Sequence, residues 1–141
     1  MDFNFKQALE TLNESQYIED AAKKVEDTAK KVLESTISEL KKNHVFLSNI
    51  SRISFYIRQK NDGEVVLKSC YSSKDNHVIL RELCSINNGF SWELNLAVIE
   101  KLEAELKEEG FKCINFKDME DIYEITNSRD MRAPEGFDVR L

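Results

Sequence analysis

A long apolar stripe near the start of the chain constrains the fold more than any other feature. Its members are separated by three or four residues, which is the period of a helix, and they are Ile18, Ala22, Val25, Ala29, Leu33, Ile37 and Leu40. Because Ser15 can cap it, we predict a helix over 15–42, after a shorter helix over 3–12. Twenty-eight helical residues measure about 42 Å, whereas a compact chain of 141 residues is only about 37 Å across. Such a helix spans the domain and can overhang it.

A change to strand-like patterns follows the long helix. Apolar and polar residues alternate over 52–59 (RISFYIRQ), which is typical of a strand. KNDG then suits a turn, and 64–72 (EVVLKSCYS) suits a second strand that runs back beside the first. This arrangement predicts a β-hairpin. The next segment, 77–86, fits either a strand or a helix, and we predict a third strand over 77–83.

A second amphipathic helix is predicted over 91–109. Ser91 can cap its start, and Gly110 suits the position after its end. Strands are then predicted over 112–116 and 121–126, the second pairing beside the first.

These elements predict an α+β fold: N-terminal helices, an antiparallel sheet of four or five strands, and the 91–109 helix packed on the sheet. We expect one domain over 1–126, with a helical segment at 3–42 and a C-terminal tail at 127–141. Apolar and polar residues alternate weakly in the tail, so it could instead dock as a strand on a sheet edge of this chain or of a partner. The predicted core consists of Leu33, Ile37, Leu40, Ile53, Phe55, Ile57, Leu67, Trp92, Leu96, Ile99, Leu102, Leu106, Phe111 and Ile114.

Charge and composition exclude several classes of protein. The net charge is −6 and the pI is about 5.1, which disfavours a nucleic-acid or anionic-membrane partner. No apolar run reaches the roughly 20 residues of a membrane span, and the first residues do not resemble a secretory signal. Three widely spaced cysteines suit reduced thiols. We therefore expect a cytoplasmic protein.

Motifs that carry chemistry are absent from the sequence. The four glycines are scattered, and there is no Cys-x-x-Cys or His-x-x-x-His pattern for zinc. A Cys84–His77 pair is disfavoured, because the two side chains point to opposite faces if this segment is a strand. We expect no enzyme activity, no metal and no cofactor.

The C-terminal half could present an acidic face, because residues 61–141 contain seventeen Asp and Glu but only ten Lys and Arg. Such a face attracts partners with a basic surface. Our candidate protein contacts are Glu100, Glu103, Glu108, Asp118, Glu120, Asp121 and Glu124. A solvated helix face and turn are the simpler interpretation.

The long helix offers a second kind of contact. Small and branched side chains follow a heptad pattern that could pack on a second copy of the chain, and they are Ile18, Ala22, Val25, Ala29 and Val32. The alternative is that this face packs on the protein's own core. The lysines at 23–24 and 30–31 each follow an acid four residues earlier, which favours a self-paired solvated face over a phosphate-binding one.

The first hairpin strand supplies a third candidate. Arg52, Tyr56 and Arg58 should share one face, and an exposed tyrosine between two arginines could hold a nucleotide or single-stranded nucleic acid. The leading hypothesis is nevertheless a small acidic protein that binds another protein without catalysis. Immunity proteins and phage-encoded or bacterial antagonists of larger enzymes are accessory proteins of this inhibitor type.

Overall fold

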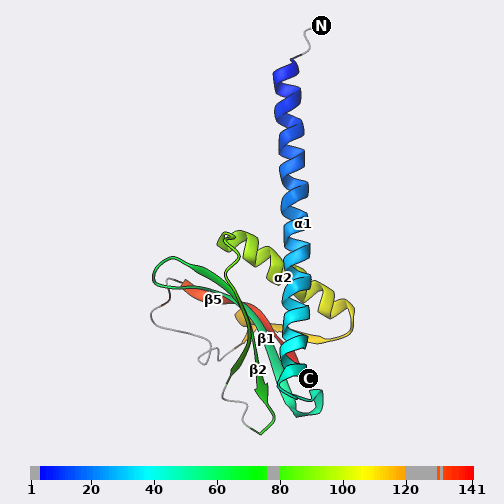
Figure 1. Ribbon diagram of the computed structural model, residues 1–141, viewed down its shortest axis with the longest axis vertical. Helices are drawn as coiled ribbons and strands as arrows, with labels where there is room; N and C mark the ends of the chain where they lie inside the picture. The colour runs from blue at the N-terminus through cyan, green and yellow to red at the C-terminus, as the bar shows by residue number, and fades with distance from the viewer. Residues whose placement is uncertain (1–3, 76–79, 120–129, 131) are drawn as a thin grey trace.

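The computed structural model describes residues 4–75, 80–119, 130 and 132–141, and for residues 10–19 it describes the helical backbone alone. Helices and a five-stranded antiparallel sheet form an α+β fold, as the sequence predicts (Figure 1). In chain order the elements are α1 (Phe5–Lys42), η1 (Leu47–Asn49), β1 (Ile50–Gln59), β2 (Val65–Ser73), β3 (Arg81–Ile86), α2 (Trp92–Glu108), β4 (Lys112–Asn115), η2 (Phe116–Asp118) and β5 (Arg132–Arg140).

The sheet has the strand order β3-β2-β1-β5-β4. The predicted hairpin is confirmed as β1 and β2, which pair antiparallel with Ile57 opposite Leu67. Gly63 closes the turn at a φ of 89°, a conformation that glycine adopts without strain. The third strand is β3, which begins four residues later than the predicted strand, so 81–86 is strand rather than helix.

The second helix is confirmed within one residue at each end. The Leu94 N–H donates to the Ser91 side chain over 3.2 Å, which satisfies an otherwise unpaired amide at the helix start. Gly110, at a φ of 95°, ends the helix, and the Phe111 N–H donates back to the Leu106 carbonyl over 3.0 Å. This pair of features is a Schellman cap.

The C-terminal segment contains a strand inside the sheet rather than a free tail. β5 lies between β1 and β4 and pairs antiparallel with both. Phe137 on this strand is fully buried and stacks on Phe55, with ring centroids 5.5 Å apart. The strand alternative is therefore correct for 132–140, although the strand joins β1 and β4 rather than a free edge. The predicted strand over 121–126 and the domain end at 126 lie outside the described residues.

One continuous helix replaces the two that the sequence suggested. α1 begins after Asn4, whose side chain accepts the Gln7 N–H over 3.2 Å, and it passes through Ser15 without a break. No glycine or proline stands between residues 3 and 42. Extending a helix adds one hydrogen bond per residue, whereas restarting one requires a new nucleus, so the helix continues.

The main core lies between the helices and one face of the sheet. Its fully or nearly fully buried members include Ala29, Val32, Phe55, Ile57, Leu67, Trp92, Val98, Ile99, Leu102, Leu106, Phe137 and Val139. Two predicted core residues are wrong, because Ile37 is 51% exposed and Phe111 is 39% exposed. Ile37 follows the apolar period, but it stands where α1 has passed the edge of the core. Phe111 follows Gly110, beyond the end of α2. Leu40 and Ile114 are partly buried but lie outside the core clusters.

Candidate protein-binding surfaces

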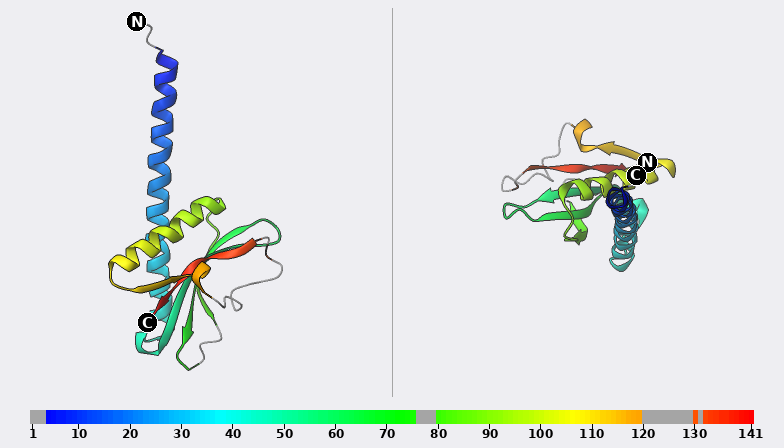
Figure 2. Two further views of the ribbon diagram at one scale, coloured as in Figure 1. Left: turned by 180° about the vertical axis from the view of Figure 1, so that it is seen from behind. Right: turned by 90° about the horizontal axis from the view of Figure 1, so that it is seen from above.

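The N-terminal half of α1 projects away from the rest of the protein (Figure 1). Figure 2 shows the same overhang from behind and shows α1 nearly end-on from above. From Asp20 toward the C-terminus, the first partly buried side chain is Ala21, and the first fully buried one is Ala29. The projecting segment 5–20 is thus about 24 Å long, and its tip exposes Phe5 and Leu9 at 67% and 44%.

An apolar groove opens at the other end of α1. It has a volume of about 330 Å³ and lies between the last turns of α1, the C-terminal end of α2 and the sheet. Its lining is Leu33, Thr36, Ile37, Leu40, Leu47, Ile53, Phe55, Leu106, Glu109, Phe111, Val139 and Leu141. Glu109 is the only charged residue in this lining.

The groove walls arise from the ends of three elements. α1 ends in a Schellman cap, in which the Val45 N–H donates to the Leu40 carbonyl over 2.9 Å and His44 takes a φ of 54°. This cap turns the chain toward Leu47, while Phe111 follows the α2 cap and the Leu141 N–H donates to the Ser51 carbonyl over 3.1 Å.

Exposed large apolar residues are concentrated in this groove. Ile37, Leu47, Phe111 and Leu141 are between 39% and 63% exposed and all line it. Scattered exposed apolar residues are ordinary, whereas a contiguous patch marks an interaction surface. The sequence missed this site, because Ile37 and Phe111 were assigned to the core and Leu47 carried no pattern.

The heptad face predicted for self-association is largely used by the protein's own core. Ala29 and Val32 are 1% and 0% exposed, and Val25 packs against the same core cluster. Ala22 is exposed, and the Ile18 side chain lies outside the described part. The alternative interpretation, a face packed on the protein itself, is therefore correct from Val25 onward.

The acidic candidates are partly paired within the chain. Glu103 accepts from Asn115 over 3.4 Å and forms an ion pair with Lys107 at 2.9 Å. Glu100, Glu108 and Asp118 are exposed. The remaining candidates, Glu120, Asp121 and Glu124, fall outside the described residues.

The Arg52–Tyr56–Arg58 face does not form an open aromatic platform. Tyr56 is only 5% exposed, and its ring lies 6.0 Å from that of Phe116 in η2. Its hydroxyl is 3.4 Å from the Cys70 sulfur. Burial raises the pKa of the Tyr56 hydroxyl above its ordinary range. The expectation of an exposed Tyr56 is thus wrong, because Phe116 of η2 packs with Tyr56 and Cys70 on this face of the sheet.

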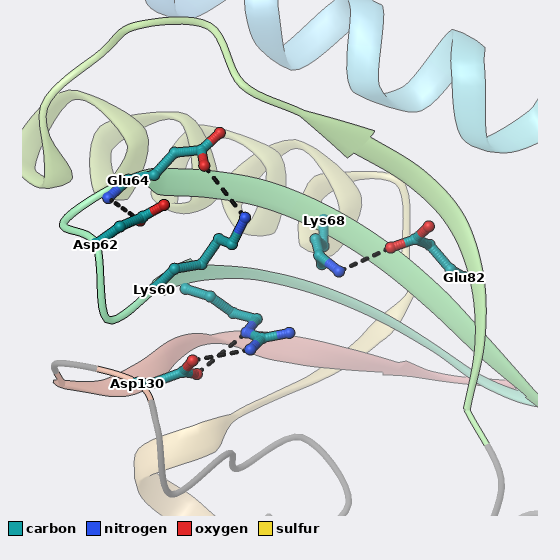
Figure 3. Close-up of polar contacts among 7 residues, drawn as sticks. Lys60, Asp62, Glu64, Lys68, Glu82 and Asp130 are labelled. Carbon is teal, nitrogen blue, oxygen red and sulfur yellow. Dashed lines mark hydrogen bonds and ion pairs between the residues drawn. The ribbon is translucent and has the colours of Figure 1, made fainter.

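The arginines of this face are paired with acids. Arg58 forms a two-pronged contact with Asp130, with nitrogen–oxygen distances of 2.8 and 3.1 Å. Arg52 lies 3.4 Å from the fully buried carboxylate of Asp138. The neighbouring cations are paired too: Lys60 with Glu64 at 3.2 Å and Lys68 with Glu82 at 2.8 Å, as Figure 3 shows. A phosphate group would have to displace these acids.

The thiols are poorly suited to nucleophilic chemistry. Burial raises the pKa of Cys70, Cys84 and Cys113, so the reactive thiolate form is disfavoured. Among the described residues, no three His, Cys, Asp or Glu side chains are grouped in a way that could hold a metal ion. Within the same residues, neither α1 nor α2 has the apolar stretch that a membrane crossing requires.

Comparisons with protein-family models, with curated proteins and with solved structures find no match for this chain.

Proposed function

We propose that this protein binds another protein without catalysing a reaction, and that the apolar groove is the contact. The observation that carries the proposal is the convergence of Ile37, Leu47, Phe111 and Leu141, all substantially exposed, around one cavity. An amphipathic helix that lays apolar side chains into such a groove is a common mode of recognition. On this proposal the protein acts as a cytoplasmic accessory protein, a class that includes inhibitors of larger enzymes.

The residues that line the groove indicate what kind of segment would bind there. The lining is almost wholly apolar, so the bound segment should present leucine-like or aromatic side chains at helical spacing. Glu109 stands in the lining, and Glu108 is exposed beside it. A basic residue next to the apolar anchors would complement these carboxylates.

A photoreactive amino acid placed at Ile37 tests the proposal in living cells. Ile37 is half exposed, so the fold should tolerate the change. We expect a covalent adduct with a protein, and we expect the same label at Asn61, exposed in the β1–β2 turn, to give none. An added Phe111→Asp substitution should abolish the adduct. If Ile37 gives no adduct, or if both positions label equally, the groove is not a protein-binding site.

A further inference from the structure

We propose that the groove is occupied by the N-terminal half of α1 from a second copy of this chain, with the two α1 helices antiparallel. This inference rests on the proposed function and names its partner. It uses a different face of α1 from the small-residue face that packs on the core.

A second heptad stripe runs along α1. Its positions are spaced alternately by four and three residues, and they are Phe5, Leu9, Leu12, Gln16, Glu19, Lys23, Glu26, Lys30, Leu33, Ile37 and Leu40. The stripe is apolar at both ends and charged in the middle. Heptad spacing of this kind keeps one side of a helix in contact with another helix along its length.

Part of this second stripe is exposed on the folded protein. Lys23, Glu26 and Lys30 are exposed, and Ile37 is 51% exposed. Leu33 and Leu40, its last apolar members besides Ile37, line the groove. The core-facing stripe, by contrast, ends in Val32 and Thr36, which are 0% and 2% exposed.

The order of residues along the stripe suits an antiparallel partner. When Leu9 of one copy is set against Leu40 of the other, Leu12 falls against Ile37. In the same register, Glu19 falls against Lys30 and Lys23 against Glu26, and the two-fold axis repeats each of these pairs. A parallel pair in register would instead set each charge against its own kind. Charged heptad positions specify the direction of helix pairing in this way.

The same register brings the second copy's helix to the groove, where Gln16 falls against Leu33. Leu9 and Leu12 of the second copy come to Leu40 and Ile37, which form its wall. The helix cannot supply these residues to its own groove, because Leu9 and Leu40 are separated by about 46 Å of helix. A second copy also covers the exposed Leu9 and supplies the projecting segment with tertiary packing, which provides most of the stability of helices in proteins.

Sedimentation velocity over a series of concentrations tests whether the chain dimerises. We expect the wild type to dimerise and Ile37→Asp to dimerise at least about a hundredfold more weakly, since each dimer contains the site twice. Lys23→Glu should weaken dimerisation about tenfold, and adding Glu26→Lys should restore it. Lys24→Glu, on the same turn but outside the stripe, is the matched control. A wild type that stays monomeric, or an equal effect of Lys23→Glu and Lys24→Glu, would overturn the proposal.

The direction of pairing is tested by mixing two separately purified variants. Leu9→Cys and Leu40→Cys are mixed, with one of them tagged, and treated with a short thiol crosslinker. The antiparallel dimer should give mixed crosslinks that exceed those of either variant alone, and the wild type controls for its own cysteines. Crosslinks of each variant to itself would show a parallel dimer and refute the register.

The two proposals fail in different ways. If the wild type is monomeric and Ile37 gives a photoadduct with a different protein, the dimer proposal is refuted but the proposed protein-binding function is supported. A monomer with no adduct at Ile37 would refute both proposals.

Discussion

The two halves of α1 are the same helix in very different surroundings. From Ala29 onward, α1 is held by burial against α2 and the sheet, and Thr36 shares a hydrogen bond of 2.7 Å with Ser69 on β2. Over 5–20 the helix projects, and its tip exposes Phe5 and Leu9. A continuous hydrogen-bonded backbone therefore joins a half stabilised by packing to a half that projects from the rest of the protein.

This contrast shows that helical period alone does not tell which side of a helix is buried. Two heptad stripes lie on adjacent faces of α1. Ala29 and Val32 of the first are buried in the core, whereas in the second Leu33 packs against the core and Ile37 is half exposed. Similar substitutions placed at buried and at exposed positions test this difference.

Introducing a charge should have the largest effect. Val32→Asp places a carboxylate in the core without a partner and should lower the free energy of unfolding by about 4 kcal/mol or more. Ala22→Asp, at an exposed position on the same face just after the projecting segment 5–20, should change the free energy of unfolding by less than about 0.5 kcal/mol. Thermal unfolding followed by circular dichroism measures both. If Val32→Asp does not fold, Val32→Ala should still cost about 2 kcal/mol. Equal effects at the two positions would contradict the account.

Removing one buried hydroxyl should have a smaller effect. Thr36→Val leaves the Ser69 hydroxyl buried without this partner and should cost about 1–3 kcal/mol. The double variant Thr36→Val/Ser69→Ala should recover part of that loss, because neither hydroxyl then remains unpaired. Ser38→Ala, exposed two residues away, is the control. Urea unfolding of these three variants and of Ser69→Ala alone would detect the recovery, and strictly additive losses would rule out the coupling.

The smallest effect should come from the helix caps. Asn4 and Ser91 each accept an N–H over 3.2 Å at the start of a helix. Ser91→Ala should reduce the global free energy of unfolding by about 1 kcal/mol, since α2 forms part of the core. Asn4→Ala should fray the projecting end of α1 and leave global unfolding of a monomeric Ile37→Asp background unchanged. A global loss on Asn4→Ala as large as that on Ser91→Ala would show that the projecting half belongs to the same folding unit.

Local signals account for the parts of the fold that the sequence predicted. The hairpin and α2 carry their own turn, cap and apolar period, so their positions follow from neighbouring residues alone. β5 does not. Pro134 lacks a donor and Gly136 lacks a side chain, a composition that argues against an inner strand. A register shift between Ile57 and Gln59 of β1 accommodates the segment that contains Pro134.

Gly136 illustrates why such a strand needs its partners to be recognised. A Cβ atom at this position would come within 2.1 Å of the Phe55 carbonyl oxygen and 2.5 Å of the Tyr56 Cβ. The glycine therefore fits β1 at one register, a long-range match that local patterns cannot reveal. The groove escaped prediction for a similar reason: exposure of Ile37 and burial of Tyr56 depend on where Leu47 and Phe116 come to lie.

Hydrogen exchange along α1 at two protein concentrations tests the central claim most directly. The account predicts that amides over 29–42 are protected at both concentrations, because packing within the chain holds them. Amides over 5–20 should be protected only at the higher concentration, and Ile37→Asp should remove that protection. Equal protection of 5–20 at both concentrations and in the variant would contradict the account, because the projecting helix would then be stable without a second copy.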